Sequence, residues 1–160
     1  MDGKDTLALL PTGGGKSICF QVPAIQMDGI CIVVSPLIAL MKDQVLNLEK
    51  RGIAAFAIYS GMGFRDIDRI FELCTQGHVK FLYLSPERLA TDLAIERIKR
   101  MNVNLFAVDE AHCISQWGYN FRPSYLNIAE IRELHPKVPV LALTATATQE
   151  VVVDIQDKLE

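Results

Sequence analysis

Short apolar runs alternate along the chain with longer stretches in which apolar residues recur at helical spacing. The run Ile30–Ser35, ICIVVS, is almost continuously apolar and rich in β-branched residues, which is typical of a strand buried on both faces. The stretch Leu37–Lys50 carries an apolar stripe three or four residues apart, which predicts an amphipathic helix. The same reasoning predicts strands at Thr6–Leu10, Ile53–Tyr59, Lys80–Leu84, Val103–Val108 and Pro139–Leu143, and helices at Lys16–Gln26, Phe64–Cys74, Thr91–Arg100, Tyr125–Leu134 and Glu150–Leu159.

This alternation predicts an α/β fold: a mostly parallel sheet of about six strands with helices on both faces. The 160 residues contain no internal repeat or linker, and half of them are hydrophobic, so we expect a single domain spanning 1–160. In such sheets ligands bind at the carboxyl ends of the strands. Chemistry is therefore expected in the loops at 11–17, 35–37, 60–63, 85–88, 109–122 and 144–148.

Charge and composition narrow the class of protein. The net charge of −3 argues against a protein that coats nucleic acid by bulk charge, so any such contact must be local. The chain has no apolar run of the ~20 residues that a membrane helix needs, and its start lacks the order of a secretion signal. We therefore expect a cytoplasmic, bacterial nucleoid-associated protein. The cysteines form no CxxC pair, so buried reduced thiols are favoured over zinc ligands or disulfides at Cys19, Cys31, Cys74 and Cys113.

The sequence PTGGGKS between the first strand and the first helix has the layout of a phosphate-binding loop. Three consecutive glycines let backbone N–H groups approach phosphate oxygens, and the helix N-terminus adds partial positive charge. Lys16 would pair with the β- and γ-phosphates, and the Ser17 hydroxyl would be a ligand for Mg²⁺. The strict pattern has glycine where Leu10 stands, so a glycine-rich turn beside a surface lysine is the alternative. The glycines concerned are Gly13, Gly14 and Gly15.

A second candidate site lies where the strand Val103–Val108 ends on two adjacent carboxylates, Asp109 and Glu110. Such a pair beside a buried strand is costly unless a cation meets it. A Mg²⁺ ion between Ser17 and Asp109 would do so, and Glu110 could then take the proton of an attacking water. His112 could pass the phosphate state to a neighbouring loop by hydrogen bonding. The alternative is an acid pair that caps a helix without metal.

Alternating aromatic residues follow these carboxylates in one loop: Trp117, Tyr119 and Phe121, with Gln116 and Arg122 beside them. Nucleic-acid bases stack on aromatic rings with about 1–3 kcal/mol each and without regard to sequence. Some of these rings could instead pack under the loop as core. We expect at least Trp117 or Arg122 to contact DNA.

Six motifs in order resemble one known family: PTGGGKS, VVSPLIALMKDQV, YLSPERL, DEAHCISQWG, FRPSY and ALTATAT. They resemble the first RecA-like motor domain of the RecQ family of DNA helicases, in helicase superfamily two, over nearly the whole chain. The resemblance implies a three-layer P-loop NTPase fold, ATP and Mg²⁺ as ligands, and single-stranded and junction DNA as partner. In this superfamily the phosphate loop is commonly shorter, which accommodates Leu10.

The resemblance also implies roles for individual residues. Thr12 would join the three glycines in the phosphate cradle, and the aromatic-rich loop would sense single-stranded DNA. Relatives commonly read WGHDFRP where this chain has Tyr119 and Asn120, so the stacking surface is retained while a histidine and an acid are missing. The residues implied to touch the DNA backbone are Ser35, Pro36 and Ser85. Those implied to couple the nucleotide state to DNA binding are Thr144 and Thr146.

Relatives carry further parts that the resemblance leads us to expect elsewhere. These are an adenine-reading glutamine motif upstream, a second motor domain with an arginine finger, and zinc-binding and winged-helix modules. We therefore expect a monomeric fragment of a longer ATP-dependent DNA helicase, weak or inactive alone, that acts in replication, recombination or repair. The alternatives are another P-loop nucleoside triphosphatase, such as a small-molecule kinase or translocase, and a nucleic-acid-binding module without unwinding.

Overall fold

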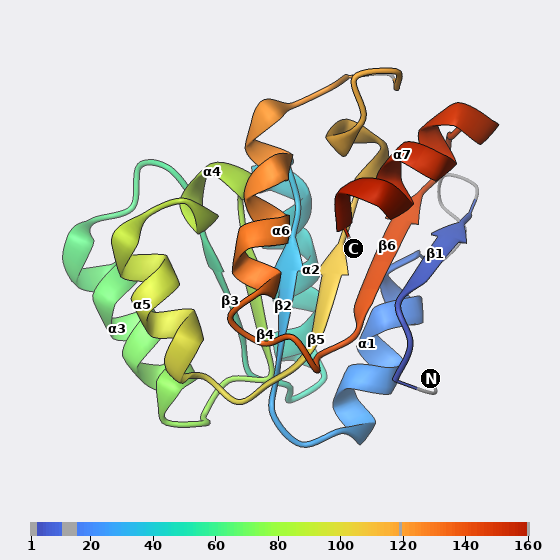
Figure 1. Cartoon of the computed structure of the whole chain (residues 1–160). Helices are drawn as coiled ribbons and strands as arrows, with labels where there is room; N and C mark the ends of the chain where they lie inside the picture. The colour runs from blue at the N-terminus through green and yellow to red at the C-terminus, as the bar shows by residue number, and fades with distance from the viewer. Residues whose placement is uncertain (1–2, 11–15, 119, 160) are drawn as a thin grey trace.

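A single parallel sheet forms the centre of the computed structural model, which describes residues 3–10, 16–118 and 120–159 (Figure 1). The order of its six strands is β1-β6-β5-β2-β4-β3, and every neighbouring pair runs parallel. This confirms the predicted α/β class and strand number. The strands are β1 (Thr6–Leu9), β2 (Ile30–Val34), β3 (Ala55–Ile58), β4 (Phe81–Leu84), β5 (Val103–Val108) and β6 (Val140–Thr144).

Helices cover both faces of this sheet, because successive strand residues point to opposite sides. In β2, Ile30, Ile32 and Val34 belong to one apolar core, while Cys31 and Val33 belong to the other. The first core is closed by α3, α5, α6 and α7, and the second by α1 and α2. The helices are α1 (Lys16–Gln26), α2 (Ile38–Lys50), α3 (Phe64–Thr75), α4 (Pro86–Leu89), α5 (Asp92–Arg100), α6 (Asn127–Arg132) and α7 (Gln149–Leu159).

Two segments differ from the sequence prediction. The residues after β4, predicted as a loop, form the short helix α4, because Pro86 suits the first helical position and the Ser85 hydroxyl accepts the N–H of Arg88 at 3.3 Å. The helix predicted from Tyr125 is split into a 3₁₀ turn, η2 (Pro123–Leu126), followed by α6. A further 3₁₀ turn, η1 (Ala111–Ile114), lies in the loop after β5.

The expectation of four buried thiols holds for three cysteines and is wrong for Cys19. Helix α1 turns Phe20 and Ala24 towards the sheet, which leaves the neighbouring Cys19 on its outer face. Burial raises the pKa of the Cys113 thiol to about 11, and that of Cys74 to about 12, so both stay protonated. Among the described residues, no helix is long and apolar enough to cross a membrane.

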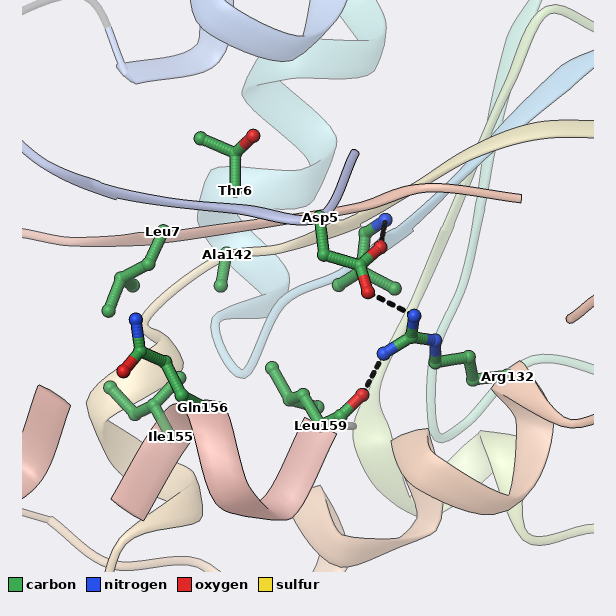
Figure 2. A pocket seen from close by; sticks show the side chains of 9 residues that line it. Asp5, Thr6, Leu7, Arg132, Ala142, Ile155, Gln156 and Leu159 are labelled. Carbon is green, nitrogen blue, oxygen red and sulfur yellow. Dashed lines mark hydrogen bonds and ion pairs between the residues drawn. The ribbon is translucent and has the colours of Figure 1, made fainter. Parts of the chain in front are cut away.

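The amino ends of β1 and β6 border a hollow of about 310 Å³ (Figure 2). The Arg132 guanidinium at the end of α6 donates to the Asp5 carboxylate and to the Leu159 carbonyl at the end of α7. The other Asp5 oxygen accepts the N–H of Val140 at 2.9 Å. The two charged side chains that line this hollow are thus paired with each other. Arg132 and Asp5 thereby connect α6 and α7 to the sheet at the amino ends of its strands, opposite the carboxyl ends.

Candidate functional site

The loops that the sequence singles out meet at the carboxyl edge of the sheet. The last residue of β2, Val34, pairs with Val108 of β5, which in turn pairs with Ala142 of β6. The residues that follow β2 and β5, Ser35 and Asp109, therefore lie beside the carboxyl end of β6. The N–H of Asp109 donates to the Val34 carbonyl at 2.9 Å, so the β5 loop begins in register with its neighbour.

Lys16, the first residue of α1, reaches both predicted carboxylates. Its Nζ atom lies 3.3 Å from Oε1 of Glu110 and 3.8 Å from Oδ1 of Asp109. All three side chains are at least three-quarters removed from solvent, so the charges interact with little screening. The predicted phosphate cradle lies outside the described residues; it comprises Thr12, Gly13, Gly14 and Gly15.

Asp109 is a buried carboxylate in an environment that disfavours its charge. Burial is the main cause that raises its pKa above the ordinary range, and the neighbouring Glu110 adds to this, whereas Lys16 opposes it. A divalent cation would remove the cost of that charge, and oxygen ligands suit Mg²⁺. Ser17 follows Lys16 in the first turn of α1 and supplies the second predicted oxygen.

A Mg²⁺ ion needs few ligands from the protein itself. No group of three histidine, cysteine or carboxylate side chains in the described part of the chain could hold a metal ion alone. Mg²⁺ usually takes only one or two carboxylates and completes its shell with water and substrate phosphates. Asp109 and Ser17 would supply two oxygen ligands of the kind that Mg²⁺ takes from a protein.

Glu110 has left-handed backbone geometry, with φ 52° and ψ 45°. For a residue other than glycine this conformation costs on the order of 1–3 kcal/mol and is concentrated at functional sites. Its N–H donates to Oδ1 of Asp109 at 2.9 Å, and its carbonyl accepts the N–H of Cys113 at 3.0 Å. Nothing in the sequence indicates this turn, because glutamate does not favour the left-handed region.

His112 lies between Glu110 and the end of β6, and its predicted relay role stays a prediction. Its Nδ1 atom lies 2.7 Å from Oγ1 of Thr144 and 3.6 Å from Oε2 of Glu110. The Thr144 hydroxyl donates to the Thr146 carbonyl at 3.1 Å and accepts the Thr146 N–H at 3.3 Å. His112 and Thr144 are both buried. Hydrogen bonds thus run from His112 through Thr144 to Thr146, and Glu110 lies beside the start of this chain of contacts.

The aromatic loop presents Trp117 to solvent: 74% of its surface is exposed, so this ring is not core. Gln116 is also exposed, and Phe121 is half-buried, whereas Tyr119 lies outside the described residues. The loop packs closely on η1, because a Cβ atom at Gly118 would lie 2.8 Å from the His112 carbonyl oxygen. The backbone next to Trp117 therefore lies against η1 in the loop after β5.

Arg122 joins the aromatic loop to both segments predicted to touch the DNA backbone. Its guanidinium donates to the Pro36 carbonyl at 3.3 Å and to Oε1 of Glu87, in α4, at 2.7 Å. Partial burial alone would raise the pKa of Glu87, but its own N–H, Ser124 and Arg122 together hold it below the ordinary value. Sequence reasoning missed Glu87, although it lies in the SPERL motif.

Two predicted DNA-contacting hydroxyls have local backbone partners. Oγ of Ser35 lies 3.5 Å from the N–H of Leu37, and Ser85 caps α4. Both therefore shape their loops, and a role towards DNA stays a prediction. A hollow of about 340 Å³ opens between the loop after β5 and the aromatic loop, with Glu110 and Arg122 in its lining.

Comparison with known families and proteins gives one consistent result. A family described as DEAD/DEAH box helicase matches residues 1–155. The chain is 48% identical over 160 residues to the probable ATP-dependent DNA helicase RecS of Bacillus subtilis (strain 168), covering 100% of this chain and 32% of RecS. It is 50% identical over 157 residues to the ATP-dependent DNA helicase RecQ of the same organism, covering 98% and 27%. The resemblance to RecQ helicases is thus confirmed, and the chain spans 32% and 27% of the length of these two relatives.

Solved structures show the same fold at lower sequence identity. The helicase Lhr of Mycobacterium smegmatis, bound to ssDNA and AMP-PNP, gives a TM-score of 0.74 at 22% identity, covering 94% of this chain and 22% of Lhr. The Hef helicase domain of Pyrococcus furiosus gives 0.71 at 23% identity, covering 98% and 33%. These matches support the predicted three-layer fold.

Proposed function

The chain belongs to the DEAD/DEAH box helicases, and on this premise we propose that it is the ATP-hydrolysing motor lobe of a RecQ-type DNA helicase. The observation that carries the proposal is the meeting of Lys16 with Asp109 and Glu110 at the carboxyl edge of the sheet. A phosphate-binding lysine and a strand-end acid pair are the parts that P-loop phosphoryl transfer requires.

The lysine and the catalytic acid can exchange partners during the reaction. The Nζ atom of Lys16 is paired with Oε1 of Glu110 at 3.3 Å. Phosphate oxygens arriving beside α1 would compete for Lys16, since they carry more negative charge than one carboxylate. Glu110 would then be free to accept the proton of the attacking water. Mg²⁺, held by Ser17 and Asp109, would neutralise charge on the β- and γ-phosphates.

DNA binding would act on this centre through the aromatic loop. Trp117 offers an exposed ring for base stacking, and Arg122 ties the loop to Pro36 and α4. The chain has a net charge of −3, so we place the DNA contact at these loops rather than over a broad basic surface. His112 and Thr144 supply the route by which the catalytic loop and the loop after β6 would respond to each other.

One experiment separates this function from its alternatives: ATP hydrolysis and strand separation by the protein that carries this domain, with and without single-stranded DNA. We expect hydrolysis to rise with single-stranded DNA and strand separation to require ATP. A small-molecule kinase would transfer phosphate without responding to DNA, and a non-catalytic module would bind DNA without turnover. Hydrolysis that is indifferent to DNA, together with no strand separation, would contradict the proposal.

A further inference from the structure

Tyr125 is a fully buried side chain whose hydroxyl group is hydrogen-bonded to the loop that follows β5. It lies in η2, and its hydroxyl donates to the carbonyl oxygen of Asp109 at 2.8 Å. Burial raises the pKa of this phenol well above its ordinary value, so the group remains a hydrogen-bond donor at any pH suitable for an assay.

That hydrogen bond completes the fixation of one peptide unit, the one between Asp109 and Glu110. Its carbonyl oxygen is held by Tyr125, and its N–H is held by the Asp109 side chain at 2.9 Å. With both polar groups held, the peptide plane has one orientation, and the φ angle of Glu110 is measured from that plane. The strained value of 52° is therefore maintained by these two bonds together with the bond from the Cys113 N–H to the Glu110 carbonyl.

The same anchors are connected to the aromatic loop through Arg122. The N–H of Tyr125 donates to the Arg122 carbonyl at 3.0 Å, and the N–H of Arg122 donates to the Cys113 carbonyl at 2.8 Å. Tyr125 and Cys113 are the two residues beyond Asp109 that hold the backbone of Glu110. A shift of the aromatic loop at Arg122 thus acts on both of them.

We propose that Tyr125 is a positioning residue for Glu110, which it keeps in the strained conformation that presents its carboxylate to Lys16, and that it relays the position of the aromatic loop to that carboxylate. The inference rests on the proposed function, since it takes Glu110 as the proton acceptor in ATP hydrolysis. It assigns Tyr125 no contact with nucleotide or DNA.

The test compares two variants that each remove one buried hydroxyl, Tyr125→Phe and Tyr83→Phe. Tyr83 is equally buried, at 1% exposure, and its hydroxyl accepts a hydrogen bond from Gln21 at 3.3 Å. Kinetic constants for ATP are measured in the whole protein at saturating single-stranded DNA, and the melting temperature Tm is measured for both variants. Tyr125→Phe leaves the buried Asp109 carbonyl unpaired, so Glu110 is held less firmly. We expect kcat to fall about 10-fold and KM to change less than about twofold. Tyr125→Phe should also reduce the ratio of the DNA-stimulated rate to the basal rate. Tyr83→Phe should keep the wild-type kcat and the wild-type ratio.

Wild-type kcat and stimulation in Tyr125→Phe would overturn the inference and leave the proposed function standing. An equal loss of kcat in both variants would overturn it too, because general destabilisation would then explain the effect. If the wild-type protein shows no DNA-dependent hydrolysis, the proposed function fails, and amide hydrogen exchange decides the inference without turnover. Exchange at Glu110 and Cys113 should then be about 10-fold faster in Tyr125→Phe than in Tyr83→Phe, and equal rates would overturn it.

Discussion

The Nζ atom of Lys16 lies 3.3 Å from Oε1 of Glu110, although 94 positions separate the two residues in the sequence. The contact joins the start of α1 to the end of β5, where the parallel sheet brings distant loops to one edge. It pairs the charge of a carboxylate that is three-quarters buried. The same ammonium group is the proposed phosphate ligand, so we expect nucleotide phosphates to compete with Glu110 for it.

Replacing Lys16 with alanine should weaken nucleotide binding strongly. One charge-assisted interaction is worth about 1.5–3 kcal/mol, so we expect the affinity for a fluorescent ATP analogue to fall about 10- to 150-fold. The variant should also have a lower Tm at neutral pH, because Asp109 and Glu110 then lie side by side without a cation. The exposed Lys158→Ala in α7 serves as the control. Unchanged affinity in Lys16→Ala would contradict the assignment.

Asp109→Asn should raise the Tm of the metal-free domain at pH 7. The pKa of Asp109 is raised in the folded state, mainly by burial, so the folded protein binds this proton more tightly than the unfolded chain. The stabilisation that protonated Asp109 provides is therefore fully present below the unfolded pKa of about 3.9. It is lost as pH rises through the raised folded pKa, and above that value the buried, ionised carboxylate destabilises the fold. Asparagine removes that cost and can still accept the Glu110 N–H.

Thermal denaturation in EDTA between pH 4 and pH 8 checks this expectation. The advantage of Asp109→Asn should shrink as pH falls, and the same variant should bind Mg²⁺ with nucleotide more weakly than the wild type. A variant that melts below the wild type at pH 7 would contradict the account of Asp109.

Trp117 provides its own test of DNA contact, because it is the single tryptophan of the chain. Stacking on a base should quench its emission during titration with an oligo-dT strand. Trp117→Ala should lower the affinity for that strand about 5- to 150-fold, which corresponds to about 1–3 kcal/mol for one stacked base. Trp117→Phe should retain most of the affinity, since it keeps a ring. Wild-type affinity in the alanine variant would remove Trp117 from the DNA site.

Arg132→Met should destabilise the domain without affecting nucleotide binding. Arg132 joins the ends of α6 and α7 to Asp5 (Figure 2), at the edge of the sheet opposite the segments that hold Lys16 and Glu110. Partly exposed ion pairs contribute up to about 1 kcal/mol, which corresponds to a fall in Tm of about 2–4 °C in a domain of this size. A change in the affinity for an ATP analogue would show that the contacts of Arg132 and the nucleotide site are coupled, contrary to this expectation.

The sequence predicts those parts of the molecule that depend on local pattern. Apolar runs such as Ile30–Ser35 identify buried strands, and a parallel sheet necessarily gathers their carboxyl ends, which is why Asp109 could be placed near Lys16. The sequence does not predict backbone conformations that are set by contacts between residues far apart in the chain. The left-handed turn at Glu110 is held by Tyr125, 16 positions away from Asp109, and no local signal announces it.

Hydrolysis of ATP by Glu110→Gln tests the central claim most directly. Glutamine has the same size but cannot accept the proton of the attacking water, so ATP binding should be retained. Turnover stimulated by single-stranded DNA should fall at least about 100-fold, the usual contribution of a general base. A Glu110→Gln protein that binds ATP and turns it over at the wild-type, DNA-stimulated rate would contradict the account.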